Sequence, residues 1–73
     1  MPLPLSTDEL VRLAANGGGF EVDVAQFSQA DLVRIAANTA ASGAKIVIIN
    51  ARHISIDNLV QIAANGKGNI FFQ

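Results

Sequence analysis

The phrase "LVRIAAN" (residues 32–38) occurs three times, with little change, in this chain of 73 residues. It reads "LVRLAAN" at residues 10–16 and "LVQIAAN" at residues 59–65. Each copy follows a serine by four residues, and Ser6, Ser28 and Ser55 lie 22 and 27 residues apart. Periods of about 20–50 residues are typical of proteins built from stacked units. The sequence therefore predicts a single domain (1–73) of three repeats, at approximately residues 6–27, 28–54 and 55–73.

Each repeat begins with the pattern of a helix start. A serine at the N-cap can accept a hydrogen bond from the free N–H groups of the first helical turn. Ser6 with Glu9 forms a capping-box pattern. Asp31 and Asn58 hold the same position in the other two copies. An apolar residue before each serine is spaced to pack on the leucine of the phrase, as in a hydrophobic staple. These apolar residues are Leu5, Phe27 and Ile54.

The helices are expected to end at glycines. Gly17 and Gly66 follow the asparagine of their phrases, where glycine can adopt the left-handed C-cap conformation. The middle copy continues as "AANTAASG". This predicts a longer second helix that reaches about Ser42 and stops at Gly43.

An extended run follows each helix. "FEVDV" (residues 20–24) alternates apolar and acidic residues, "KIVIIN" (residues 45–50) is apolar on both faces, and "NIFFQ" (residues 69–73) is short. These patterns predict a strand with one solvent-exposed face, a central strand and a terminal edge strand. Strand–helix–strand connections within one sheet are nearly always parallel and right-handed.

The predicted fold is therefore α/β: a short right-handed αβ solenoid of three α-β repeats. Its three-stranded parallel sheet has the order 1-2-3, with the helices on one face. The arrangement resembles that of leucine-rich repeats in its logic, although their Leu/Asn strand signature is absent.

The sheet face away from the helices is predicted to be apolar. Alignment of the three runs on Gly19, Gly43 and Gly68 assigns each strand residue to one of the two faces. The helix side would carry Phe20, Val22, Val24, Ile46, Ile48 and Phe71. The open side would carry Glu21, Asp23, Lys45, Val47, Ile49, Ile70 and Phe72.

The apolar residues of that open side form a predicted contact surface. Parallel sheets are usually covered on both faces, and contiguous apolar patches mark contact sites. Either the N-terminal "MPLPL" or the chain end folds over this patch, or a partner covers it, most simply a second copy of the chain. The terminal edge strand offers a second route to self-association. The predicted interface residues are Val47, Ile49, Ile70, Phe72 and Lys45.

Composition narrows the classes of function. Cysteine is absent and His53 is the only histidine, so neither a disulfide nor a thiolate or imidazole metal site is expected. The net charge of −1 gives no general attraction to nucleic acid or anionic lipid. No run of 18 apolar residues occurs, and "MPLPLS" lacks the basic region of a secretory signal. We expect a cytoplasmic protein that has no membrane span and uses no cofactor.

Two patterns that could indicate catalysis or phosphate binding have simpler explanations. His53, Ser55 and Asp57 lie within one short segment, but Ser55 is already explained as a helix cap and no oxyanion site accompanies it. "NGGG" and "NGKG" follow helix C-termini, where the helix dipole repels anions, so they indicate turns. No catalytic residues are predicted, and the protein is not expected to be an enzyme.

The start of each unit resembles the DNA-binding repeats of transcription-activator-like effectors. The resembling stretches are "LSTDELVRLAANGGG" (residues 5–19) and "FSQADLVRIAANT" (residues 27–39). The units of that family continue into a second helix, whereas each unit here continues into a predicted strand. The resemblance implies base-specifying pairs at Asn16-Gly17, Asn38-Thr39 and Asn65-Gly66, with Arg12 and Arg34 on the helix layer.

The predicted function is a non-enzymatic protein–protein interaction or assembly module. It would self-associate, as a homodimer or a larger assembly, through the open sheet face and the terminal edge strand. One alternative is a DNA-binding module that uses the asparagine loops at the helix ends. A second alternative is a small protein inhibitor or adaptor that uses the same open face.

Overall fold

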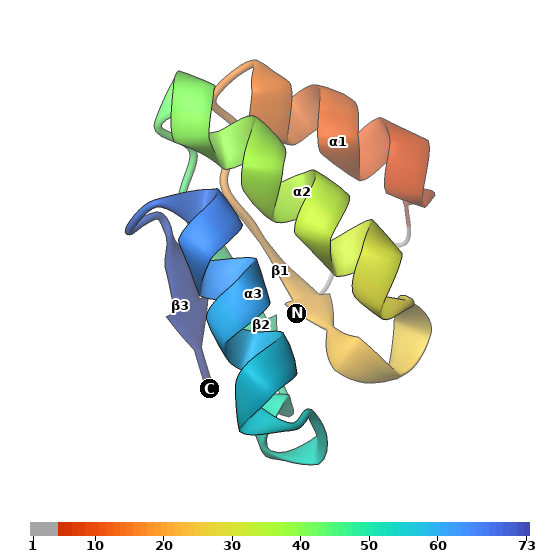
Figure 1. Cartoon of the computed structure of the whole chain (residues 1–73). Helices are drawn as coiled ribbons and strands as arrows, with labels where there is room; N and C mark the ends of the chain where they lie inside the picture. The colour runs from red at the N-terminus through yellow and green to blue at the C-terminus, as the bar shows by residue number, and fades with distance from the viewer. Residues whose placement is uncertain (1–4) are drawn as a thin grey trace.

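The computed structural model describes residues 5–73, in which helices and strands alternate along the chain (Figure 1). The elements are α1 (Thr7–Ala15), β1 (Phe20–Asp23), α2 (Gln29–Ser42), β2 (Ile46–Ile49), α3 (Ile56–Gly66) and β3 (Ile70–Phe72). Two short 3₁₀ turns, η1 (Val24–Gln26) and η2 (Ala51–His53), connect each of the first two strands to the next helix. The predicted alternation of three helices and three strands is confirmed.

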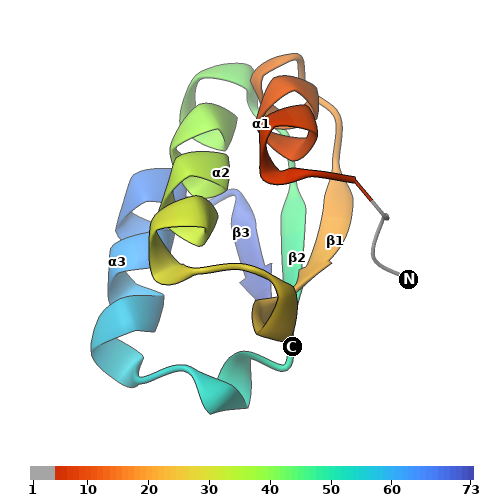
Figure 2. The same ribbon diagram turned by 90° about the vertical axis from the view of Figure 1, so that its right-hand side faces the viewer.

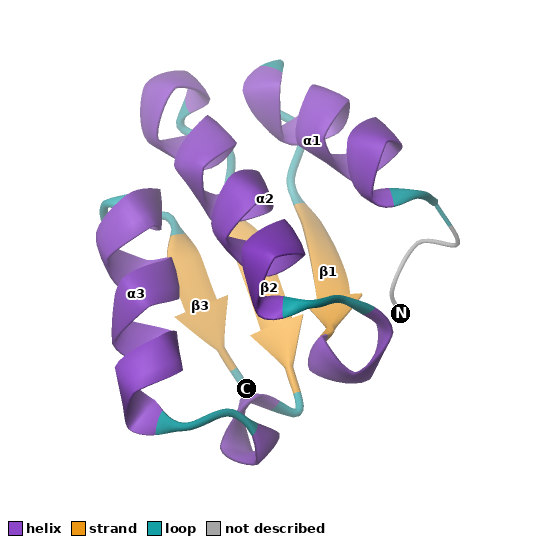
Figure 3. Cartoon of the chain, turned by 45° about the vertical axis from the view of Figure 1, so that its right-hand side comes forward, coloured by secondary structure: helices purple, strands orange, loops and turns teal. Residues whose placement is uncertain are grey.

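The three strands form one parallel sheet in the order β1-β2-β3. The register pairs Phe20 with Ile46 and Ile46 with Ile70. The helices form a second layer on one face of this sheet, with α2 between α1 and α3 (Figures 2 and 3). The α/β class and the parallel sheet in chain order were therefore predicted correctly.

The hydrophobic core lies between the helix layer and the sheet. Its buried residues are Leu10, Ala14, Phe20, Val22, Leu32, Ile35, Ala36, Ile46, Ile48 and Ile62. Ala14 and Ala36 are fully buried, because their small side chains allow the helices to lie close to their neighbours. Complete burial of one large aliphatic side chain contributes about 1.5–3 kcal/mol. The repeated phrase supplies the helical half of this core.

All three helices start at the predicted serines. The hydroxyl oxygens of Ser6, Ser28 and Ser55 accept hydrogen bonds from backbone N–H groups three residues later, at 3.3, 3.2 and 3.3 Å. Only the first copy closes the capping box, because Glu9 Oε1 also accepts from the Ser6 N–H at 3.0 Å. The three residues before the serines pack against the core; they are Leu5, Phe27 and Ile54.

The first two helices end as predicted, whereas the third does not. α1 ends before Gly17 (φ +89°), and α2 ends at Gly43, which adopts φ +80°. α3 runs through Gly66, and the left-handed position falls on Lys67 (φ +50°). Gly66 is instead required for packing, because a Cβ atom there would lie 2.2 Å from Ile70 Cγ1.

The side-chain directions of β3 also correct the prediction. Ile70 and Phe72 are in register with Ile46 and Ile48, whose side chains are buried beneath the helices. Ile70 and Phe72 therefore lie on the helix side, and Phe71, in register with Val47, lies on the open face. The cause is a connection one residue shorter than the glycine alignment assumed, and a shift of one residue reverses both faces of a strand.

Buried hydrogen bonds set this shorter connection. Asn69 is buried, and its Nδ2 donates to the Thr39 carbonyl oxygen of α2 at 2.9 Å. Its own carbonyl oxygen accepts from the Ile46 N–H at 2.9 Å. Thr39 is also buried, with its hydroxyl donating to the Ala36 carbonyl at 2.7 Å. These bonds fix the position of Asn69, the residue that precedes β3.

Candidate interaction surfaces

The sheet face opposite the helices carries the first candidate surface. Val47 and Ile49 are half-buried there, and Phe71 on the neighbouring strand is 51% exposed. None of the helices in residues 5–73 covers this face (Figure 2). We call these three residues the open-face strip. Of the predicted interface residues, Val47 and Ile49 belong to it, whereas Ile70 and Phe72 do not.

Charged residues flank the open-face strip. Glu21 and Asp23 alternate with the core residues of β1 and so share the face of the strip. Asp23 Oδ1 accepts from the Ala25 N–H at 2.9 Å, and Oδ2 accepts from Asn50 Nδ2 at 3.0 Å. These hydrogen bonds, the backbone one first, lower the pKa of the Asp23 carboxyl from its ordinary value. Lys45, which precedes β2, donates through Nζ to Asn69 Oδ1. Charged side chains therefore border the open-face strip.

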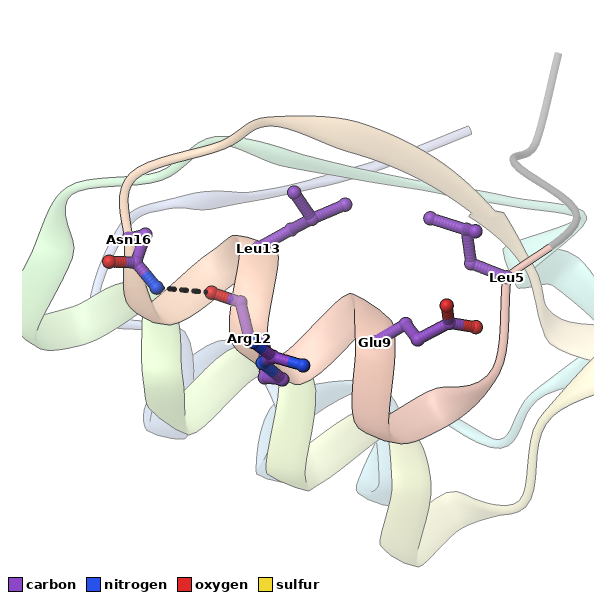
Figure 4. Close-up of a pocket in the computed structure, with 5 residues that line it drawn as sticks. All are labelled: Leu5, Glu9, Arg12, Leu13 and Asn16. Atoms are coloured by element: carbon purple, nitrogen blue, oxygen red, sulfur yellow. Dashed lines mark hydrogen bonds between the residues drawn. The ribbon is translucent and has the colours of Figure 1, made fainter.

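A second surface lies along the outer side of α1. Leu5 and Leu13 line a hollow of about 440 Å³ together with Glu9, Arg12 and Asn16 (Figure 4). Leu13 belongs to the repeated phrase, and its side chain is 39% exposed. We call this hollow the α1 side.

A third surface lies along α3. Ile56 is 71% exposed and Val60 is 57% exposed, so two large apolar side chains lie four residues apart on one helix, in solvent. We call this pair the α3 side. The sequence carried a signal for the α3 side that our prediction missed. Ile56 occupies the position at which the other two copies have the polar residues Thr7 and Gln29.

The asparagines that the resemblance to DNA-binding repeats singled out share one structural role. In Asn16, Asn38 and Asn65 the side-chain Nδ2 donates to the backbone carbonyl four residues earlier, each at 2.8 Å. This bond satisfies a carbonyl group near the end of a helix, or within α2, and explains why the phrase ends in asparagine.

The residues paired with these asparagines differ in their surroundings. Gly17 is exposed after α1, whereas Thr39 and Gly66 are buried inside α2 and α3. The second and third pairs therefore do not form loops. Arg12 is exposed on α1, and Arg34 forms an ion pair with Asp8 at 3.1 Å.

The segment around the only histidine forms a shallow surface. His53 lies in η2 and lines a hollow of about 280 Å³ whose other members include Phe27, Ile54 and Asn58. The Ser55 hydroxyl is bound to the Asn58 N–H as a cap. Within the described part of the chain, no group of three histidine or acidic side chains is placed to hold a metal ion. Among residues 5–73, no helix has the length and apolar character needed to cross a membrane.

Comparisons of the chain with protein-family models, with curated proteins and with solved structures found no match.

Proposed function

We infer that this protein is a non-enzymatic assembly module: a short αβ solenoid of three units that binds further copies of itself. The observation that carries this proposal is the open-face strip. A parallel sheet is normally covered on both faces, and this one has helices on a single side. Val47, Ile49 and Phe71 offer apolar area that a second copy would remove from water at about 25 cal/mol per Å².

The size of the chain supports the same proposal. A domain of about this size buries only about 60% of the surface that its unfolded chain exposes, which leaves little margin of stability. Small domains usually gain stability from disulfides, metals or association. The sequence contains no cysteine and one histidine, so association is the route that this composition favours.

Charge supports a protein partner over a polyanion. Six acidic residues outnumber five Lys and Arg residues, and Glu21 and Asp23 lie beside the open-face strip. Binding to nucleic acid depends largely on cations that neutralise phosphates. The acidic border of the strip favours instead a partner with its own apolar surface, which a second copy provides.

The proposal is tested by measuring molar mass with light scattering after size exclusion. The wild-type chain is expected at twice the monomer mass or more, and Val47→Asp and Phe71→Asp at lower mass, because each places a charge in the contact. Ala30→Asp, an exposed position on α2 away from the strip, serves as the matched control and should keep the wild-type mass. A wild-type chain that stays monomeric at high concentration would refute the proposal.

A further inference from the structure

Equivalent positions in the three copies of the phrase have similar residue types but differ in how far their side chains are buried. Leu13 in α1 is 39% exposed, whereas Ile35 and Ile62 at the same position of α2 and α3 are fully buried. Val60 in α3 is exposed, whereas Val11 and Val33 at its equivalent positions are half-buried and pack against the core. These differences occur in α1 and α3, the outer helices, each of which has α2 as its neighbouring helix among residues 5–73 (Figure 3). The exposed apolar residues therefore lie where a neighbouring unit would cover them.

Polar contacts between neighbouring helices follow one direction. Asp8 near the start of α1 accepts from Arg34 in the middle of α2, at 3.1 Å. Gln29 at the start of α2 donates to Gln61 in the middle of α3, at 3.0 Å. In both cases a side chain in the first turn of one helix is hydrogen-bonded to a side chain of the repeated phrase in the next helix. Every helix thus has a side that faces the preceding unit and a side that faces the following one.

Each of the two outer helices carries one of the two residues that such a contact with a further unit would need. Asp57 in α3 stands at the position that Asp8 holds in α1, and Arg12 in α1 stands at the position that Arg34 holds in α2. Asp57 and Arg12 are both exposed. If a second chain placed its α1 beside α3, Asp57 and Arg12 would meet with opposite charges. The same placement would bring the α3 side against the α1 side, so that Val60 and Ile56 cover Leu13.

We propose that copies of this chain stack end to end, with α3 of one copy packed against α1 of the next. The contact would repeat the helix pairing that the chain already contains twice, which is why a second copy fits it better than another partner. β3 of one copy would then lie beside β1 of the next. Because the two surfaces in contact are different, the assembly stays open at both ends and can grow.

This proposal extends the proposed self-association to a second pair of surfaces. The helix-side residues that carry it, Leu13, Ile56 and Val60, do not belong to the open-face strip. Variants of the strip and variants of the two helix sides can therefore fail independently, and each result reports on one contact.

The test uses two variants that each block one side. Leu13→Glu places a charge on the α1 side, and Val60→Glu places one on the α3 side; both positions are partly exposed, so both variants are expected to fold, as circular dichroism would check. The chain has no cysteine, so Ala37→Cys on the exposed surface of α2 gives a single site for a fluorescent label. Labelled Leu13→Glu is titrated with unlabelled Val60→Glu, and in parallel with unlabelled Leu13→Glu.

End-to-end stacking predicts that the mixed pair binds at least tenfold more tightly than the like pair. The mixed pair retains one intact junction, between α3 of the Leu13→Glu chain and α1 of the Val60→Glu chain, so its binding should saturate at one to one. Equal binding in the two titrations would overturn the proposal. This holds also where the mixed pair and the like pair both bind through the open-face strip. Ala30→Glu, which adds the same charge to α2 away from both sides, should bind labelled Leu13→Glu as tightly as Val60→Glu does.

Exchange of charges tests the orientation of the junction. Asp57→Arg and Arg12→Asp should each weaken association by roughly twofold, as expected for the loss of one exposed ion pair. A mixture of the two variants recreates an opposite pair at the junction, and its affinity should return toward that of the wild type. Stronger association of either variant alone would contradict the proposed alignment.

Discussion

Gly66, at the end of α3, has no room for a Cβ atom beside Ile70, and its replacement gives a sharp prediction at the residue scale. An added Cβ atom would lie 2.2 Å from Ile70 Cγ1 and 2.9 Å from Cδ1. Gly66 is buried at the end of α3, so the added methyl group fits only if the half-buried Ile70 side chain shifts. We expect Gly66→Ala to lower the free energy of unfolding by about 1–3 kcal/mol, as overpacked cores do. Urea denaturation followed by circular dichroism measures the loss.

The double variant separates this clash from any effect on the helix. Ile70→Ala removes both atoms that the new methyl group would strike. In that background Gly66→Ala should be neutral, or stabilising by up to about 1 kcal/mol, because alanine favours a helix more than glycine does. An unchanged loss in the Ile70→Ala background would mean that the contact with Ile70 is not the cause.

Two carboxylates give the fold a dependence on pH. Hydrogen bonds from Ser6, the backbone one first, lower the pKa of Glu9, and the Ala25 N–H followed by Asn50 lowers the pKa of Asp23. A folded-state pKa below the unfolded value means that this stabilisation is fully present above the unfolded pKa and is lost as the pH falls through the folded pKa. The ordinary values are 4.5 for Glu9 and 3.8 for Asp23.

We therefore expect the urea midpoint to decrease as the pH falls from about 6 to about 3, through the ordinary range of carboxyl pKa values. Glu9→Gln with Asp23→Asn removes both titrations while it keeps an oxygen acceptor at each site. This double variant should lose less of its midpoint over the same pH interval than the wild type. A larger loss in the double variant would show that these two carboxylates do not stabilise the folded state.

At the scale of the elements, one position of the phrase should matter differently in different helices. Ile35 is 1% exposed in the central helix, whereas the equivalent Leu13 is 39% exposed. Truncation of a buried aliphatic side chain to alanine costs about 2–5 kcal/mol, which we expect for Ile35→Ala. Leu13→Ala should cost well under half as much at a concentration low enough to keep the chain monomeric. Equal losses, measured by urea denaturation under the same conditions, would contradict the burial described here.

The starts of the elements could be predicted from the sequence because local chemistry determines them. Ser6, Ser28 and Ser55 cap the helices through hydrogen bonds within four residues of chain, so a short pattern was enough. The parallel order of the strands followed from the alternation of elements, since a helix between two strands of a sheet favours a parallel connection.

The direction of the β3 side chains could not be predicted because contacts distant in sequence decide it. Asn69 binds the Thr39 carbonyl, 30 residues earlier, and this bond begins β3 one residue sooner than the glycine spacing suggested. The candidate surfaces divide in the same way. Val47 and Ile49 were assigned to the open face correctly because β2 is regular, but Phe71 was missed because of the shift in β3. The exposure of Leu13 follows from the position of α1 at the end of the helix layer within residues 5–73, which the phrase alone does not reveal.

At the scale of the whole molecule, the three candidate surfaces share one property. The open-face strip lies on one face of the sheet, and the α1 and α3 sides lie at opposite ends of the helix layer (Figures 2 and 3). All three combine large apolar side chains with charged borders. A molecule that buries so little surface on folding gains stability when any of them is covered. We therefore expect folding and association of this chain to be coupled.

Coupling of this kind makes stability depend on protein concentration. A partner that binds only the folded state adds a free energy that grows with the logarithm of its concentration, up to about 1.4 kcal/mol for each tenfold increase. The urea midpoint and the melting temperature of the wild type should therefore rise when the protein is concentrated from the low micromolar range by two steps of tenfold. The variant that combines Val47→Asp, Leu13→Glu and Val60→Glu places a charge on all three surfaces, so it lacks both proposed contacts and should show a constant midpoint. Each single variant should retain part of the dependence, since the open-face strip and the helix sides contribute separately. A wild-type midpoint that stays constant over this range would show that the folded chain is stable alone.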